Sequence, residues 1–286
     1  MKVLVSGGRG LLGREISKIL EDSNFNFFSF DKEEMDITKK EKVLEIFEKL
    51  TPDIVIHCAA YTNVDKAEIE KDEAKRVNVE GTKNIVSIAS KFSSYFIYIS
   101  TDYVFDGRKN IPYKEGDTPN PINFYGYTKF LGEKIVLDYP KSLIIRTSWL
   151  FGEHGKNFVN TIYNFSKKRN KIEVVNDQIG SPTYAKDLSF AILEILKKPT
   201  FGIIHITNDG YCSWYEFARE ILNFLNWKGE LIAIKTEDLK RLAKRPRYSV
   251  LDTEKFKKSY NFKLRNWKEA LKDYLNVLLY SSNKRN

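Results

Sequence analysis

The residues best suited to chemistry in this sequence are a tyrosine and a lysine four positions apart, Tyr125 and Lys129. On a helix this spacing puts both side chains on one face. A nearby ammonium favours a phenolate, so we expect Lys129 to lower the pKa of Tyr125 and to make it a usable proton donor near neutral pH. Lys129 could also bind ribose hydroxyls. Thr101, at the end of an earlier predicted strand, could hydrogen-bond a substrate carbonyl oxygen.

The spacing itself is not specific, because the sequence contains two further copies, Tyr163/Lys167 and Tyr280/Lys284. Only Tyr125 comes after a strand that ends in Ser-Thr, and only Tyr125 opens a helix after a Pro-containing turn. We interpret the other two pairs as solvated helix faces. Thr101, Tyr125 and Lys129 are therefore the candidate catalytic residues.

A glycine-rich turn near the N-terminus predicts a dinucleotide site. Gly7, Gly10 and Gly13 form the pattern G-x-x-G-x-x-G between a predicted strand at 2–5 and a predicted helix at 11–20. The first glycine allows a tight turn, the second lets backbone approach a pyrophosphate, and the third allows close packing of helix and strand. The start of the helix offers N–H groups and partial positive charge to the phosphates.

The residues after the second predicted strand bear on the choice of cofactor. Asp31 stands where an acid would accept a hydrogen bond from the ribose 2′-OH of NAD(H). The adjacent Lys32 could hold a 2′-phosphate instead. NADPH and NADH both remain open at this stage.

The elements that must position these residues form a repeating pattern. Predicted strands at 2–5, 25–30, 53–57, 95–100 and 143–146 alternate with helical periodicity at 11–20, 40–50, about 79–91 and from Tyr125 onward. This alternation predicts an α/β fold, a Rossmann-like doubly wound parallel sheet. After Ser148, predicted strands and helices alternate less regularly. This indicates a smaller C-terminal α/β substrate region over the carboxyl ends of the strands. We expect residues 1–150 plus about 180–207 to bind NAD(P), and about 151–179 plus 208–286 to bind substrate.

Composition excludes several classes of protein. The chain has 286 residues and a net charge of +9, with no apolar run of about 18 residues that would span a membrane. Two cysteines and three histidines are too scattered for a redox or metal motif, and a cytoplasmic location is expected.

Residues 235–286 hold 15 basic and 6 acidic side chains, so the excess positive charge lies there. No nucleic-acid-binding motif accompanies it, and we expect no nucleic-acid or membrane partner.

Longer ordered segments carry a family resemblance. They lie at 59–68, 100–107, 146–149, 177–183, 213–218 and 245–252. With the glycine turn and the Thr/Tyr/Lys trio, the chain resembles the extended short-chain dehydrogenase/reductase family, and within it the dTDP-4-dehydrorhamnose reductases, from residue 1 to about 270. The resemblance implies reduction of the 4-keto group of dTDP-4-dehydro-L-rhamnose to dTDP-L-rhamnose, the last step of dTDP-rhamnose biosynthesis. NADPH or NADH would supply hydride, Tyr125 the proton, and Thr101 would orient the carbonyl.

The resemblance also implies a set of binding residues. Cofactor contacts would fall on Gly7, Gly10, Leu11, Leu12, Gly13, Asp31, Asp36, Ile37, Ala59, Ala60, Tyr61, Tyr125 and Lys129, with Thr62 beside them. Substrate contacts would fall on Thr101, Asp102, Tyr103, Trp149 and Arg245. Some family members hold Mg²⁺ at a dimer contact, and Glu15 could match one ligand. Lys186 stands beside Asp187 where a pair of acidic residues would help to bind Mg²⁺, so no metal is predicted. A homodimer is possible.

Two other functions stay open. A sugar-nucleotide dehydratase or epimerase has the same fold, but the family's dehydratases carry Glu directly after Thr-Asp, where this chain has Tyr103. A non-catalytic dinucleotide-binding subunit, resembling the regulatory subunit of methionine adenosyltransferase, would not need the intact trio.

The excess positive charge near the C-terminus leads to a specific expectation about substrate binding. A sugar nucleotide is a small dianion that needs one or two cations. We expect Arg245 or Arg247 to contact its pyrophosphate, and most of the other basic residues to form a solvated face.

Overall fold

Six parallel strands form the centre of the structure, a computed structural model that describes residues 1–283. In spatial order they are β10-β5-β4-β3-β1-β2. Every neighbouring pair is parallel. The strands are β1 (Lys2–Ser6), β2 (Asn26–Phe30), β3 (Ile54–His57), β4 (Tyr95–Thr101), β5 (Ser142–Thr147) and β10 (Gly202–His205). The predicted doubly wound parallel sheet is confirmed, and its order reverses between β1 and β3, where such sheets bind ligands.

Alternating apolar residues fill both faces of this sheet. In β1, Val3 and Val5 pack into the core on one face, and Leu4 packs into the core on the other. In β4, Ile97 packs into the same core as Val3 and Val5, and Phe96 packs into the core on the opposite face. Strands buried on both sides need apolar residues at almost every position, which is why they appear in the sequence as short continuous apolar runs.

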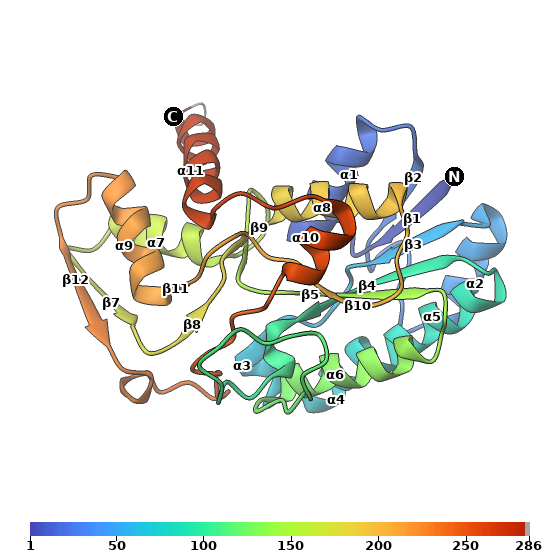
Figure 1. Cartoon of the computed structure of the whole chain (residues 1–286), viewed down its shortest axis with the longest axis horizontal. Coiled ribbons are helices and arrows are strands. Elements are labelled where there is room, and N and C mark those ends of the chain that lie inside the picture. The colour runs from blue at the N-terminus through green and yellow to red at the C-terminus, as the bar shows by residue number, and fades with distance from the viewer. Residues whose placement is uncertain (284–286) are drawn as a thin grey trace.

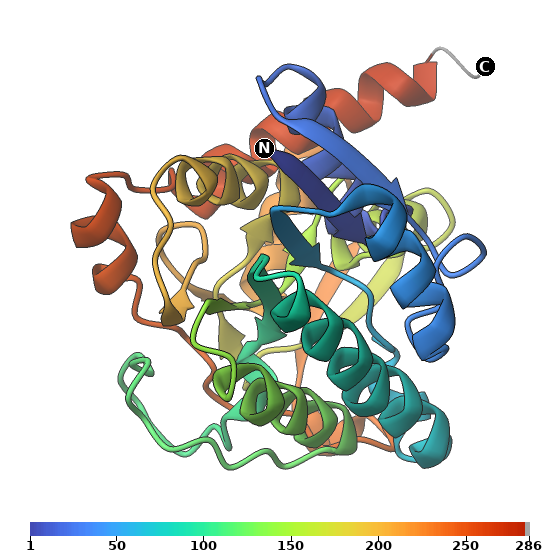
Figure 2. The same cartoon turned by 90° about the vertical axis from the view of Figure 1, so that its right-hand side faces the viewer.

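Helices cover the two faces of the sheet (Figure 1, Figure 2). α1 (Leu11–Glu21) and α8 (Ala185–Lys197) pack together over one face. The other face carries α2 (Lys40–Leu50), α5 (Thr82–Lys91) and α6 (Phe124–Leu137). The predicted helix at 40–50 coincides with α2.

Short elements connect the strands at their carboxyl ends. They are α3 (Val64–Ala67), α4 (Lys71–Lys75), the π-helix η1 (Arg76–Gly81) and the 3₁₀ helix η2 (Asp102–Val104). The helix predicted near 79–91 therefore begins as a π-helix and continues as α5. A π-helix is uncommon and often lies at a functional site.

A smaller α/β region lies beside the sheet, at the left of Figure 1. Its core is rich in aromatic residues, among them Phe151, Tyr184, Phe217 and Tyr274. Three two-stranded sheets pair β12 with β7, β11 with β8 and β6 with β9. The remaining elements of the chain are β6 (Leu150–Phe151), α7 (Phe158–Ser166), β7 (Lys171–Val175), β8 (Ile179–Gly180), β9 (Thr183–Tyr184), β11 (Cys212–Ser213), α9 (Trp214–Phe224), β12 (Glu230–Ile234), η3 (Thr236–Asp238), α10 (Glu254–Tyr260) and α11 (Trp267–Asn283).

Not every C-terminal element belongs to that core. Phe256 of α10 packs into the core beneath α1 and α8, on the large sheet. The domain boundaries given above stay a prediction. Among the helices within residues 1–283, none has both the length and the apolar character needed to cross a bilayer.

Candidate active site

A cavity of about 680 Å³ opens at the carboxyl ends of β1, β3, β4 and β5. All thirteen predicted cofactor residues line it, and so does Thr62. Of the predicted substrate residues, Thr101, Asp102 and Trp149 line it, whereas Tyr103 and Arg245 lie outside its lining. The fold thus gathers into one site residues that are separated by up to 142 positions in the sequence, from Gly7 to Trp149.

The glycine turn has the geometry of a phosphate cradle. Gly7 has φ +70°, and a Cβ on Gly13 would lie 2.3 Å from the Gly7 carbonyl oxygen, so neither position tolerates a side chain. No side chain caps α1 and no acid stands in its first turn. The first N–H groups of α1 are therefore available to an anion, and the turn fits a dinucleotide pyrophosphate.

The end of the cavity at β2 carries both signs of charge. Asp31, Lys32 and Asp36 line it. Arg9, in the glycine turn, forms ion pairs of 2.6 Å with Glu33 and 2.5 Å with Glu34. Asp31 could accept hydrogen bonds from the ribose hydroxyls of NADH, and Lys32 could bind the 2′-phosphate of NADPH. The site therefore fits either cofactor.

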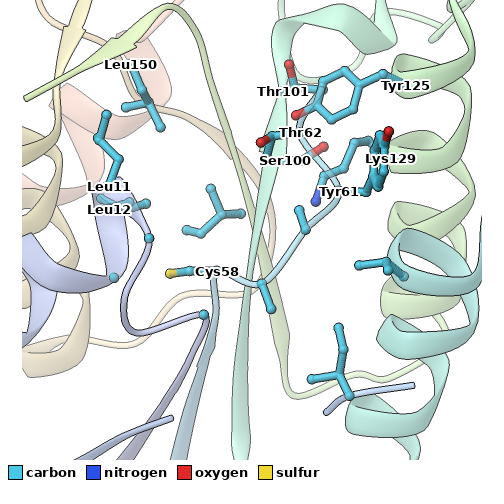
Figure 3. A pocket seen from close by; sticks show the side chains of 18 of the residues that line it. Leu11, Leu12, Cys58, Tyr61, Thr62, Ser100, Thr101, Tyr125, Lys129 and Leu150 are labelled. Atoms are coloured by element: carbon cyan, nitrogen blue, oxygen red, sulfur yellow. The ribbon is translucent and has the colours of Figure 1, made fainter. Parts of the chain in front are cut away.

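α6 presents the predicted catalytic pair, Tyr125 and Lys129, to the cavity. Asn123 caps the helix, its side chain accepting the Gly126 N–H at 2.8 Å, and this fixes where the helix starts. Figure 3 shows Thr101, Tyr125 and Lys129 on one wall, opposite the apolar side chains of Leu11, Leu12 and Leu150. Hydroxyl donors thus face an apolar wall across the cavity.

The electrostatics of Tyr125 differ from the expectation. Burial raises the pKa of Tyr125 well above its usual value, the Asp102 carboxylate raises it further, and the neighbouring Thr101 hydroxyl lowers it. Burial also lowers the pKa of Lys129 to about 7, and its ammonium lies 4.0 Å from the centre of the Tyr98 ring. The expected lowering of the Tyr125 pKa is therefore wrong, because burial disfavours the phenolate more than its surroundings favour it.

Asp102 is a second buried titratable group in the cavity. Its Oδ1 accepts a hydrogen bond from the Thr101 hydroxyl at 3.1 Å, while Oδ2 has no hydrogen-bond partner among the described residues. Burial raises its pKa to about 7, although the neighbouring Ser249 and Thr101 hydroxyls oppose the shift. An unpartnered carboxylate oxygen in the site is a ready acceptor for a ligand hydroxyl.

Asn78 in η1 is a residue that the sequence reasoning missed. Its side chain accepts the Tyr61 N–H at 2.7 Å and donates to the Tyr61 carbonyl at 3.1 Å and to Thr128 Oγ1 at 3.0 Å. It therefore ties the cofactor-facing segment around Tyr61 to the catalytic helix. A single asparagine in a helical stretch carries no sequence signal for this role.

A buried ion pair lies directly below the catalytic wall. Arg146 binds Glu133 through two hydrogen bonds of 2.8 and 2.7 Å, and the Ser100 hydroxyl donates to the same Glu133 at 2.6 Å. All three side chains are almost fully buried. Glu133 follows Lys129 by one helical turn, so this network holds α6 against the ends of β4 and β5.

Trp149 is fixed by an aromatic stack. Its ring is parallel to that of Trp214, with centroids 3.4 Å apart, and its φ of +47° is rare for a non-glycine residue. A Cβ on Gly180 would lie 2.5 Å from the Trp149 ring. The ring is thus held in place on the lining of the cavity.

Arg245 is already paired. Its guanidinium binds the Asp65 carboxylate at 2.6 and 2.9 Å, and its side chain is only 8% exposed. Arg247, by contrast, is exposed.

The two remaining Tyr/Lys pairs have different surroundings. Tyr163 in α7 is buried, with the Lys167 ammonium 4.1 Å from the centre of its ring, so its interpretation as a solvated face is wrong. The neighbouring α7 residues Val159 and Ile162 belong to the aromatic core, and the local sequence pattern does not reveal that this helix is covered. Tyr280 is exposed, while Lys284 lies outside the described residues.

Glu15, considered above as a metal ligand, lies outside the cavity. Its carboxylate, that of Glu153 and the His154 ring have ligand atoms within 4.8 Å of one another. The Lys18 ammonium lies 3.1 Å from Glu153 and 3.9 Å from Glu15, so a lysine balances part of this charge.

Comparison with known proteins places the chain in a family. The model of the RmlD substrate binding domain matches residues 1–280. The chain belongs to this family. A relative of the RmlD family named dTDP-4-dehydrorhamnose reductase, from Aggregatibacter actinomycetemcomitans, is 40% identical over 95% of this chain and 97% of its own length.

Solved structures agree with this placement. The dTDP-4-dehydrorhamnose reductase of Bacillus anthracis in complex with NADP is 38% identical, with a TM-score of 0.94 over 96% of this chain and 99% of that chain. A Clostridium acetobutylicum structure of the same name is 40% identical, with a TM-score of 0.94 over 98% and 100%. The family resemblance predicted from the sequence is confirmed over nearly the whole of this chain.

Proposed function

We propose that this chain is an NAD(P)H-dependent oxidoreductase that reduces the 4-keto group of dTDP-4-dehydro-L-rhamnose to dTDP-L-rhamnose. The observation that carries the proposal is one cavity that joins the glycine turn to Thr101, Tyr125 and Lys129. The reductase names of relatives at 38–40% identity support the substrate, and the NADP in the Bacillus anthracis structure supports the cofactor.

The chain's own residues fit the cofactor. Gly7, Gly10 and Gly13 would hold the pyrophosphate on the N–H groups of α1, Asp31 or Lys32 the adenosine ribose, and Lys129 the second ribose. When bound, NAD(P)H supplies the hydride. The apolar wall of Leu11, Leu12 and Leu150 would keep water from the reacting atoms (Figure 3).

Thr101 and Tyr125 would act on the carbonyl oxygen. The Thr101 hydroxyl holds the oxygen, and Tyr125 gives it a proton as negative charge develops there. An alkoxide is a much stronger base than a phenolate, so the raised pKa of Tyr125 keeps the phenol protonated without preventing the transfer. A protonated Lys129 would stabilise the phenolate that remains.

Asp102, Trp149 and Arg245 would bind the sugar nucleotide. Asp102 Oδ2 lacks a partner and can accept from a sugar hydroxyl, and the stacked Trp149 ring offers a flat apolar surface. Arg245 would have to bind the pyrophosphate while it stays paired with Asp65. An unchanged KM for the sugar nucleotide in both Arg245→Ala and Arg247→Ala would remove this contact.

The competing functions lack specific support. The position that carries the dehydratase carboxyl is Tyr103, a phenol whose pKa burial raises to about 12, so it supplies no carboxylate. A non-catalytic subunit would need neither a buried proton donor nor the network that holds α6.

The test is an assay with purified protein, dTDP-4-dehydro-L-rhamnose and NADPH or NADH, followed by the loss of absorbance at ~340 nm of the reduced nicotinamide. Tyr125→Phe should lower kcat by about 10²- to 10⁴-fold, because it removes the proton donor and leaves the cavity shape. Its affinity for NADP⁺ should not change. Tyr127→Phe, on the exposed side of the same helix, is the matched control and should keep full activity.

Two outcomes would contradict the proposal. Absence of turnover with either cofactor would exclude the reductase and favour the non-catalytic alternative. Full activity of Tyr125→Phe would exclude the role given to Tyr125. The homodimer and the cytoplasmic location stay predictions, of which light scattering of the purified protein tests the first.

A further inference from the structure

Thr147 is a cavity residue to which the reaction scheme above gives no role. It ends β5 and pairs in register with Thr101, which ends β4. Residues paired across parallel strands lie about 4.8 Å apart, with side chains on the same face of the sheet. Thr147 therefore stands beside the hydroxyl that would hold the carbonyl oxygen, and both line the cavity.

The Thr147 hydroxyl is buried without a partner. The residue is 3% exposed, and its Oγ1 has no hydrogen bond with any described residue. The neighbouring hydroxyls are satisfied, since Ser148 donates to the Ser181 carbonyl at 2.6 Å and Ser100 to Glu133 at 2.6 Å. An unpartnered buried hydroxyl destabilises a protein, so each such group in a native structure calls for an explanation.

The order of the strands indicates what would reach Thr147. The cavity runs along the strand ends from Asp31, which follows β2, past the turn after β1 and Ala59 after β3, to Thr101 and Thr147. A dinucleotide whose pyrophosphate lies on the turn, and whose adenosine lies toward Asp31, must extend its other half toward β4 and β5.

The polar substituent of the nicotinamide ring is its carboxamide, which both donates and accepts hydrogen bonds. The wall of Leu11, Leu12 and Leu150 offers it no partner (Figure 3). Ser100 and Ser148 are already engaged, and Thr101 and Tyr125 are needed for the substrate oxygen.

We infer that the Thr147 hydroxyl oxygen accepts a hydrogen bond from the carboxamide NH₂ of the nicotinamide and thereby positions the ring beside Thr101 and Tyr125. This inference rests on the proposed function. Thr147 is a positioning residue for the cofactor, and it leaves proton transfer to Tyr125.

The first measurement is the affinity of the unreacted protein for NADP⁺ by titration calorimetry. Thr147→Val keeps the shape of the side chain and removes the hydroxyl, and it should weaken binding about 5- to 20-fold. Thr147→Ser keeps the hydroxyl and should bind within about threefold of the wild type. The 3-acetylpyridine analogue, which carries a methyl group in place of the carboxamide NH₂, should bind the wild type more weakly than NADP⁺ does. In Thr147→Val, the analogue and NADP⁺ should bind with equal affinity.

The second measurement is thermal stability. Thr147→Val removes an unpartnered buried hydroxyl, so without ligand it should melt higher than the wild type, by about 2 °C. The increase in melting temperature on adding saturating NADP⁺ should be smaller in the variant than in the wild type. A hydroxyl that serves only the fold would instead lower the melting temperature of the unliganded protein when removed.

The outcomes separate the inference from the proposed function. Equal discrimination between NADP⁺ and the analogue in wild type and Thr147→Val would overturn the inference, and so would a lower melting temperature of the unliganded variant. Wild-type protein that binds neither NADP⁺ nor NAD⁺ would overturn the proposed function itself.

Discussion

At the scale of single residues, burial determines the chemistry of the site. Tyr125 and Asp102 carry raised pKa values and Lys129 a lowered one, and for all three burial is the largest cause. A neutral phenol beside a partly neutral carboxyl suits proton donation, and an unliganded site of this kind is destabilised by its own polar groups.

Asp102→Asn tests this cost. The pKa of Asp102 is about 7 in the folded protein and near 3.8 when unfolded, so the native state binds the extra proton. Its unfavourable contribution to the free energy of unfolding grows as pH rises from about 4 through 7, and it is fully present above pH 7. Asn is always neutral, so the variant should match the wild type near pH 4 and exceed its stability at pH 8 by on the order of 4 kcal/mol.

Urea unfolding of both unliganded proteins at a series of pH values measures this difference. A stability difference that does not vary between pH 4 and pH 8 would mean that Asp102 is ionised in the folded protein throughout this range. The Thr101 hydrogen bond, which an Asn oxygen can also accept, should persist in the variant.

At the scale of elements, the ends of the parallel strands position the site. Thr101, Thr147 and Ala59 are far apart in sequence, and the sheet register brings them to one edge. The sequence pattern predicts five of the six central strands, the helix α2 and the glycine turn well, because each is a local periodicity or a local steric requirement; it does not predict β10. It does not predict η1 as a π-helix, since the Asn78 contacts that accompany it join three separate segments.

Gly13→Ala tests the phosphate cradle at this scale. The added Cβ would lie 2.3 Å from the Gly7 carbonyl oxygen and 2.9 Å from Gly8 Cα, both backbone atoms, so the turn must shift. We expect a loss of about 1–3 kcal/mol in the free energy of unfolding and at least about tenfold weaker NADP⁺ binding.

Gly116→Ala is the control, because its Cβ would meet no heavy atom within 4 Å. It should change neither quantity. NADP⁺ binding that survives unchanged in Gly13→Ala would show that the turn does not hold the pyrophosphate.

At the scale of the whole molecule, the basic C-terminal segment binds the rest of the chain. Arg245 pairs with Asp65, Arg265 with Asp187, and Lys268 with Glu220. Lys257 and Lys263 both lie near Asp209. The net charge of +9 therefore reflects, in part, a segment that pairs with acids placed before it, and several of its lysines, such as Lys263 and Lys268, remain exposed, as expected for most of them.

Arg265→Ala should lower the free energy of unfolding by about 1–3 kcal/mol, because it leaves the Asp187 carboxylate, 11% exposed, without its bidentate partner. Lys263→Ala is the control at an exposed pair and should cost less than about 1 kcal/mol. Chemical unfolding of the three proteins at pH 7 measures both values. Equal losses would show that burial does not distinguish the two pairs.

The sequence by itself determined the fold class and the glycine turn, and it supplied the residue types of the proposed catalytic trio. These depend on local periodicity and on glycines that no other residue can replace. Only the tertiary structure decided the electrostatic state of Tyr125 and Lys129, the burial of Tyr163, the Arg245–Asp65 pair and the unpartnered hydroxyl of Thr147. A pKa, a buried surface or an unsatisfied hydrogen bond depends on everything packed around a group, and in this chain those neighbours come from distant segments.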